Sequence, residues 1–187
     1  MLGAVRRRRW SPPYLRRPIC GGYRRLPLVS ARMTCYPYVA MRVLILYETR
    51  RGFTLTVARA IRDELQRRGV LATTAPLRDV DHGTVAASDA LIVGTWVKGA
   101  IVAGVGPALG VEEGIARLPS LDGKPAAVFC TCDVAPRKTL DVLATWLRRQ
   151  GAEVTVGETF KRRKSLRQVP RFVDVVLEAF GRVRATA

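Results

Sequence analysis

The chain of 187 residues is long enough for one domain, and its 48% apolar content is sufficient for a full core. Charged residues make up 25% of the chain, which argues against general disorder. The formal net charge of +17 serves solubility or attracts anionic partners, but the basic residues are spread widely and match no nucleic-acid-binding motif, so specific nucleic-acid binding is not predicted.

The first 40 residues differ from the rest of the chain. They are rich in Arg and Pro, with nine arginines and no acid, whereas the remainder carries 23 basic and 15 acidic residues. No apolar stretch follows the basic start, so a secretory signal peptide is not predicted, and we expect a cytoplasmic protein. A transit peptide would suit the arginines, although serine is sparse. We favour a translation start at Met41, with Met33 as the other candidate, and in either case expect residues 1–40 to be disordered.

The first regular elements follow directly after Met41. Val43–Tyr47 is an unbroken apolar run, which is typical of a strand buried on both faces of a parallel sheet. A helix is predicted beyond the next loop, because Val57, Ile61 and Leu65 recur at one-turn spacing. Gly69 stands where a left-handed residue ends such a helix.

The loop between this strand and helix, residues 48–54, has the composition of an anion site. It contains one glycine, the hydroxyls of Thr49 and Thr54, and the charges of Arg50 and Arg51. The first turn of the following helix presents free N–H groups and the positive end of its dipole to this loop. The sequence therefore predicts a bound phosphate here.

The rest of the chain alternates between further strands and helices. Four more strands are predicted, over residues 70–75, 90–94, 125–131 and 153–159. A short helical or irregular crossover is expected over 78–88. Helices are expected up to Leu118, between Pro136 and Gly151, and from before Val169 to Gly181. Five alternating strands and about five helices predict a parallel sheet covered by helices on both faces.

Residues 95–99, which follow the strand at 90–94, are predicted to form a ligand-binding loop. Trp96 has the right shape to stack on a flat heterocycle, although a core aromatic at the strand end is the other interpretation. A membrane span over 90–111 is disfavoured, because Lys98, several glycines and Pro107 interrupt the apolar run.

The four cysteines, Cys20, Cys35, Cys130 and Cys132, do not suggest a disulfide framework. Cys130 and Cys132 could form a metal or redox pair, but no second Cys/His pair accompanies them, and we favour buried structural thiols. The one histidine, His82, is interpreted as a solvated turn residue rather than a catalytic base. No catalytic residue and no metal ligand is predicted.

Three loops, 48–54, 95–99 and 131–135, fall at the carboxyl ends of predicted strands. In a doubly wound sheet, ligands bind between such loops beside the point where the strand order reverses. The three loops are therefore expected to form one site.

These residues resemble the flavodoxin family over Met41 to about Gly181. The phosphate loop of that family has the form T/S-x-T/S-G-x-T, which here is Thr49-Arg50-Arg51-Gly52-Phe53-Thr54. Asp89–Trp96 resembles its third strand and first flavin loop, and Thr131-Cys132-Asp133 lies where its second flavin loop would be. The resemblance implies an α/β three-layer sandwich over 41–182 with a five-stranded parallel sheet in the order 2-1-3-4-5, a tail at 183–187, and FMN as the cofactor.

The resemblance also implies the residues that contact FMN. Residues of the phosphate loop would hold the phosphate, Trp96 would stack on the isoalloxazine ring, and backbone groups of the two flavin loops would meet its edges. The resulting cofactor-binding set is Thr49, Arg50, Arg51, Gly52, Phe53, Thr54, Thr95, Trp96, Val97, Lys98, Gly99, Thr131, Cys132 and Asp133.

The sequence also departs from the family pattern. Arg51 replaces the usual hydroxyl residue, Phe53 replaces the common Asn, and the second flavin loop lacks a covering aromatic. The basic charge contrasts with acidic carrier flavodoxins, and the loop is more similar to the branch of menaquinone-dependent protoporphyrinogen oxidase and other quinone-linked flavoproteins, without the long insertion of that enzyme.

Two functions are compatible with these features. The first is an FMN protein that carries electrons to a redox partner protein or reduces a quinone-like acceptor. The second is a flavodoxin-like domain without flavin that acts as a binding or regulatory module. The basic surface, including Lys161–Lys164, is expected to attract acidic partner proteins or anionic membrane surfaces.

Overall fold

A computed structural model describes residues 41–98, 105–133, 136, 138–162 and 165–186 of the chain. The predictions for residues 1–40, for Gly99 and for Arg163-Lys164 fall outside these described residues.

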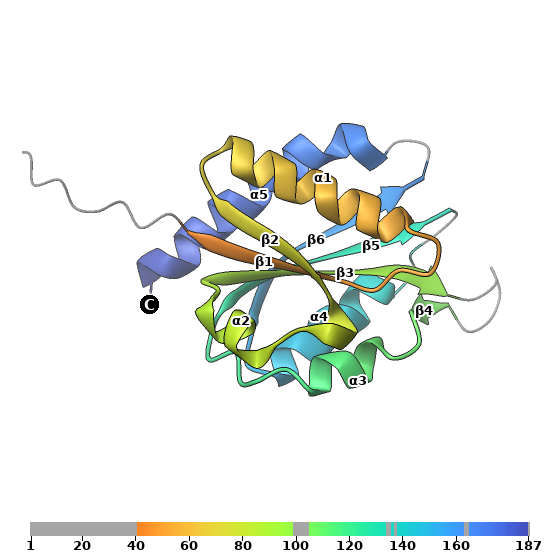
Figure 1. The fold of residues 1–187 in the computed structure, drawn as a ribbon, viewed down its shortest axis with the longest axis horizontal. Helices are drawn as coiled ribbons and strands as arrows, with labels where there is room; N and C mark the ends of the chain where they lie inside the picture. Colours follow the sequence, from red (N-terminus) through yellow and green to blue (C-terminus); the bar gives the residue numbers. More distant parts are fainter. Residues whose placement is uncertain (1–40, 99–104, 134–135, 137, 163–164, 187) are drawn as a thin grey trace, which may run out of the picture. The chain divides into compact units, whose positions relative to one another are not determined.

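The described residues form a sheet with helices on both faces (Figure 1). Its strands are β1 (Arg42–Tyr47), β2 (Leu71–Pro76), β3 (Ala90–Lys98), β4 (Gly106–Pro107), β5 (Pro125–Cys132) and β6 (Glu153–Lys161). Its helices are α1 (Phe53–Arg67), the 3₁₀ turn η1 (Leu77–Asp79), α2 (His82–Ala87), α3 (Val111–Ala116), α4 (Thr139–Arg149) and α5 (Ser165–Thr186).

Five strands are parallel and lie in the order β2-β1-β3-β5-β6. Because β4 pairs only with β3, this order is the 2-1-3-4-5 arrangement predicted from the sequence. The order reverses beside β1, and the carboxyl ends of β1, β3 and β5 lie at the same edge of the sheet. That edge is where a doubly wound fold places its ligands.

Two apolar clusters, one on each face of the sheet, form the core. Val43 and Ile45 of β1 pack with α1 and α5, whereas Leu44 and Leu46 of the same strand pack with α3 and α4. Alternate residues of a strand point to opposite faces, so a strand that is covered on both sides has to be apolar throughout. This explains the unbroken run in the sequence of β1.

Phe129 is one end of a chain of three contacting aromatic rings in the first of these clusters, with Phe160 at its centre. Its ring meets Phe160 edge-to-face at 5.7 Å, and Phe160 meets Phe172 at 5.5 Å. Gly94 on the neighbouring strand makes room for this ring, since a Cβ atom at Gly94 would lie 2.0 Å from Cζ of Phe129. The glycine is therefore a requirement of core packing.

Several predicted element ends are wrong, and pairing or packing explains each one. β3 continues through residues 95–98, predicted to be a loop, because Trp96 pairs with Thr131 of β5 and Val97 with Pro107 of β4. β6 continues two residues past Thr159, since its ladder with β5 extends to Lys161. α5 passes through Gly181, where the sequence predicted its end and a tail, and buried Val183 anchors the added turn.

Residues 90–98 form a strand, which confirms the strand predicted at 90–94, and residues 99–104 of the stretch 90–111 lie outside the described residues. None of the helices that the structure describes combines the length and the apolar character needed to cross a bilayer.

Candidate functional site

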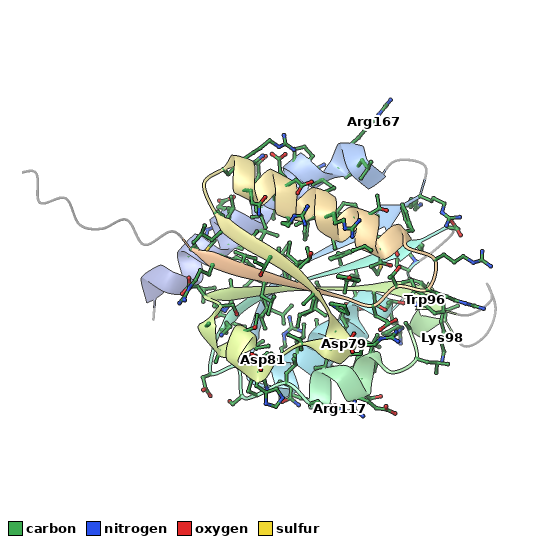
Figure 2. All side chains as sticks on the ribbon, viewed as in Figure 1. Asp79, Asp81, Trp96, Lys98, Arg117 and Arg167 are labelled. Atoms are coloured by element: carbon green, nitrogen blue, oxygen red, sulfur yellow. The ribbon has the colours of Figure 1, made fainter. Side chains whose placement is uncertain are left out.

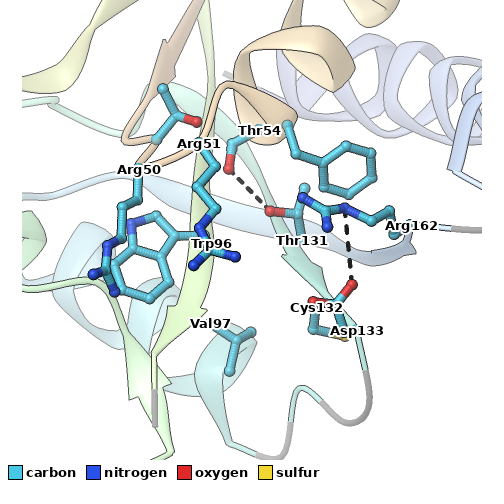
Figure 3. Close-up of a pocket in the computed structure, with 11 residues that line it drawn as sticks. Arg50, Arg51, Thr54, Trp96, Val97, Thr131, Cys132, Asp133 and Arg162 are labelled. Carbon is cyan, nitrogen blue, oxygen red and sulfur yellow. Dashed lines mark hydrogen bonds and ion pairs between the residues drawn. The ribbon is translucent and has the colours of Figure 1, made fainter.

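The carboxyl ends of β1, β3 and β5 surround an open cavity of about 300 Å³ (Figure 3). This volume is at the lower end of the range for small-molecule sites. The cavity is lined by Thr49, Arg50, Arg51, Phe53, Thr54, Trp96, Val97, Thr131, Cys132, Asp133 and Arg162. The three loops predicted to form one site therefore do meet.

The amino end of α1 forms one wall of this cavity. Gly52 caps the helix in a left-handed conformation, with φ of 81°, which favours glycine at this position. The first intrahelical bond runs from the Thr56 N–H to the Gly52 carbonyl at 2.9 Å, so the preceding N–H groups have no partner within the helix. No side chain caps these groups and no acid lies in the first turn, which leaves them for an anion.

Two threonines add hydroxyls to this wall. The Thr49 Oγ1 atom is buried and has no hydrogen-bond partner in the described part of the chain. An unpaired buried hydroxyl is costly, so a ligand oxygen at this point would supply the missing bond. The Thr54 hydroxyl is hydrogen-bonded to the Thr131 hydroxyl at 2.9 Å and fixes α1 against the end of β5. Together with the helix end, these groups fit the phosphate predicted from the sequence.

The cavity is cationic. Three arginines line it, and Asp133 is the one acid among the lining residues. Glu48, which precedes the phosphate loop, is turned away, because Arg78 donates to its carboxylate at 2.6 Å and the bond raises the pKa of that guanidinium. A negatively charged ligand therefore meets little repulsion.

Trp96 lies where a flat ligand could stack, and it also packs against the core cluster that contains Leu46. The interpretation as a core aromatic therefore agrees with the packing of Trp96, and the residue also lines the cavity. The guanidinium of Arg50 lies over its ring, with Cζ 5.9 Å from the ring centroid. A ligand that stacks on this face would have to displace Arg50, and stacking itself stays a prediction.

The two described cysteines have the character of structural thiols. Both are free and buried, and burial raises the pKa of Cys132 and raises the pKa of Cys130 to about 12. The Cys130 Sγ atom is 3.5 Å from the Thr159 hydroxyl. Such thiols are poor nucleophiles at neutral pH. Within the described ranges, no three His, Cys, Asp or Glu side chains gather as a metal site requires.

Ten of the predicted cofactor-binding residues line the cavity, three others lie outside its lining, and Gly99 is not among the described residues. Gly52 shapes the loop without lining the cavity, and buried Thr95 accepts a bond from the Ala108 N–H at 3.2 Å, which holds the turn after β4. Lys98 ends β3 outside the lining (Figure 2). His82 is exposed, as predicted, but it is the first residue of α2 and not a turn residue.

Sequence reasoning missed Arg162 as a member of the site. The residue was recognised only as part of a basic loop, because the strand before it was predicted to end at Thr159. The true end of β6 at Lys161 places Arg162 at the same edge of the sheet as the other strand ends. The register of β6 against β5 was the missing information.

Comparison with solved structures agrees with this topology. A flavodoxin from the domain Archaea matches with a TM-score of 0.60 and 19% identity, over 75% of this chain and 99% of that chain. Flavodoxin 2 from Bacillus cereus matches with a TM-score of 0.60 and 20% identity, over 73% and 98%. The fold is flavodoxin-like.

A larger flavodoxin-like protein is also similar. Rubredoxin:oxygen oxidoreductase from Desulfovibrio gigas matches with a TM-score of 0.63 and 18% identity, over 77% of this chain and 37% of that chain. No protein-family model matches the sequence, and no curated protein sequence matches it. At these identities the structural likeness establishes the fold, and the function has to be argued from the site.

Proposed function

We propose that the cavity binds FMN and that the chain carries electrons to a partner or passes them to a quinone-like acceptor. One observation carries the proposal: the uncapped amino end of α1 and the indole of Trp96 lie on the same cavity. A ligand with a phosphate at one end and a flat ring at the other suits this pairing, and FMN has that form.

Each part of the ligand has a set of residues to hold it. The Thr49 and Thr54 hydroxyls and the free N–H groups after Gly52 would hold the phosphate, and Trp96 would support the ring. Bound FMN supplies one- and two-electron chemistry. The protein binds, orients and shields the group. Electron transfer by a bound flavin needs no general acid or base.

The partner is proposed from charge. Arg50, Arg51 and Arg162 line the cavity, while Lys98 and Lys161 end the strands beside it. Such a rim attracts an acidic protein surface and speeds its association, in a manner that salt weakens. An anionic membrane surface is the second candidate, and its signature would be binding to anionic but not to neutral vesicles.

The contact between Arg50 and Trp96 favours a second candidate function. Because a side chain of the protein covers the ring face, the cavity could serve a domain that binds no flavin and acts as a binding or regulatory module. The two functions differ in whether flavin displaces Arg50.

Flavin binding tests the proposal directly. The purified protein is expected to be yellow, or to turn yellow on addition of FMN, and to quench the fluorescence of the FMN that it binds. Thr49→Val should weaken FMN binding, whereas Thr145→Val, at an exposed hydroxyl on α4 that donates to the Asp141 carbonyl, should not. A colourless protein that ignores added FMN would favour the module without flavin.

If flavin binds, the acceptor can be identified by kinetics. Turnover of NAD(P)H with a quinone would indicate an enzyme of the quinone-linked type. Electron transfer only through a second redox protein would indicate a carrier.

A further inference from the structure

Arg162 occupies a defined place at the edge of the site. It follows the last residue of β6, where Lys161 pairs with Cys132, and its backbone N–H donates to the Cys132 carbonyl at 3.4 Å. The sheet therefore fixes the point from which the side chain starts. An arginine that begins at a strand end is better placed for recognition than one on a free loop.

The side chain extends toward the amino end of α1. Its Cζ atom lies 5.4 Å from the ring centroid of Phe53, the first residue of that helix. In Figure 3 it points from the end of β6 toward the side of the cavity where Thr54 and Thr131 are joined. This cation–π contact places the guanidinium beside the amino end of α1, where the phosphate is proposed to bind.

The ion pair that Arg162 forms with Asp133 is weak. Its Nε atom is 3.9 Å from the Asp133 carboxylate, and the two side chains are 51% and 74% exposed. Exposed pairs at this separation contribute little. A guanidinium has five N–H donors in a fixed plane that matches phosphate oxygens, so most of its donors remain for a ligand. By contrast, Arg50 lies over Trp96 at the other side of the site.

We propose that Arg162 clamps the phosphate of the ligand, so that the site selects a dianionic phosphate monoester over the same molecule without its phosphate. The inference rests on the proposed function, since it assigns FMN rather than riboflavin as the preferred flavin. Arg162 would contribute a charged donor at the end of β6, in addition to the backbone and hydroxyl donors of the loop before α1. The phosphate would then contact residues at the end of β6 and at the start of α1.

The test compares Arg162→Gln with Arg167→Gln. Arg167 is an exposed arginine of α5 that points away from the sheet (Figure 2), so its loss changes the net charge equally without touching the cavity. FMN and riboflavin affinities are measured by fluorescence titration, and thermal melting confirms that each variant is folded. Inorganic phosphate is titrated separately, with the shift of the melting temperature and the ³¹P line width as readouts.

Arg162→Gln is expected to weaken FMN binding roughly ten- to a hundredfold, the usual effect of a lost charge-assisted bond, while riboflavin affinity changes less than about twofold. Arg162→Lys should recover only part of the loss, because it keeps the charge without the planar fork. Equal FMN affinities in the two glutamine variants would overturn the clamp and leave the proposed function intact. If neither flavin binds but phosphate shifts the melting temperature of the natural protein and not of Arg162→Gln, the clamp stands and the proposed function fails.

Discussion

The hydroxyls of Thr54 and Thr131 are 2.9 Å apart in the folded chain, although 77 positions separate them in the sequence. Both residues are buried, one in the first turn of α1 and the other near the end of β5. Each hydroxyl is the hydrogen-bond partner of the other, and both residues line the cavity. The pair fixes the distance between the phosphate wall and the strand end opposite to it.

Breaking this pair should reveal a coupled contribution to stability. Thr54→Val and Thr131→Val should each lower the free energy of unfolding by about 1–3 kcal/mol, because each leaves one buried hydroxyl without a partner. The double variant should lose less than the sum of the two, since no orphaned hydroxyl remains. Urea unfolding of the four proteins measures the coupling, and strict additivity would show that the hydroxyls are independent.

Gly94 should tolerate no side chain. Gly94→Ala places a Cβ atom 2.0 Å from the Phe129 ring and should destabilise the fold by about 1–3 kcal/mol or more. Gly181→Ala is the matched control, because it lies inside α5 and meets no atom within 4 Å. It should stabilise by about 0.5–1 kcal/mol through helix propensity. Thermal melting that ranks the two variants in the opposite order would refute this account of Gly94.

The order of the sheet could be predicted from the sequence because its signals are local. Buried strands such as β1 are unbroken apolar runs, and Gly69 and Gly151 mark helix ends with positive φ. What could not be predicted depends on partners distant in sequence. β3 continues to Lys98 only because β4 and β5 pair with it. Gly181 alone predicts the end of a helix, but α5 continues because Val183 beyond it is buried in the core.

In the site, too, the features with a local sequence signal could be predicted and those that depend on distant residues could not. The phosphate loop is contiguous, so its residues could be predicted, whereas the contact between Arg50 and Trp96 joins two strand ends and left no signal in either. Arg162 belongs to the site because β6 pairs with β5 as far as Lys161, and no local sequence pattern encodes that register.

The buried thiol of Cys130 should make stability fall in alkaline solution. Burial raises its folded-state pKa to about 12 from an ordinary value of 9.0, so above pH 9 the unfolded chain releases a proton that the folded chain keeps. The stabilising contribution is complete below pH 9 and is lost as the pH rises toward 12, at up to about 1.4 kcal/mol per pH unit. Urea unfolding at several alkaline pH values should show a flatter decline for Cys130→Ala than for the natural protein. Parallel curves would contradict the assignment.

Cations around a bound flavin should raise its potential. Reduction adds negative charge to the ring system, and Arg51 lines the cavity while Lys98 does not. One charge at about 10 Å near a protein surface contributes on the order of 1 kcal/mol, or some tens of millivolts for a one-electron step. We expect Arg51→Glu to lower the midpoint potentials, with a smaller shift for Lys98→Glu. Redox titration measures both, and unchanged potentials in the two variants would contradict this electrostatic argument.

Removal of Arg50 should favour a flat ligand. The guanidinium covers the indole of Trp96, and a cation–π contact of this kind contributes about 0.5–1 kcal/mol. Arg50→Ala should therefore tighten riboflavin, which lacks a phosphate for the arginine to attract, by about two- to fivefold. The exposed Arg59 of α1 provides the control Arg59→Ala, which should leave riboflavin affinity unchanged. Weaker riboflavin binding by Arg50→Ala would instead assign Arg50 to the binding surface.

The cavity is built from both ends of the folded domain, since its lining begins at Thr49 and closes with Arg162. The strand before Arg162 is covered by α5, whose Phe172 and Phe180 belong to the same core cluster as Phe160. During synthesis, the pocket is therefore incomplete until this last helix has left the ribosome. A ligand can therefore be loaded only after α5 has been synthesised, and not onto a shorter nascent chain.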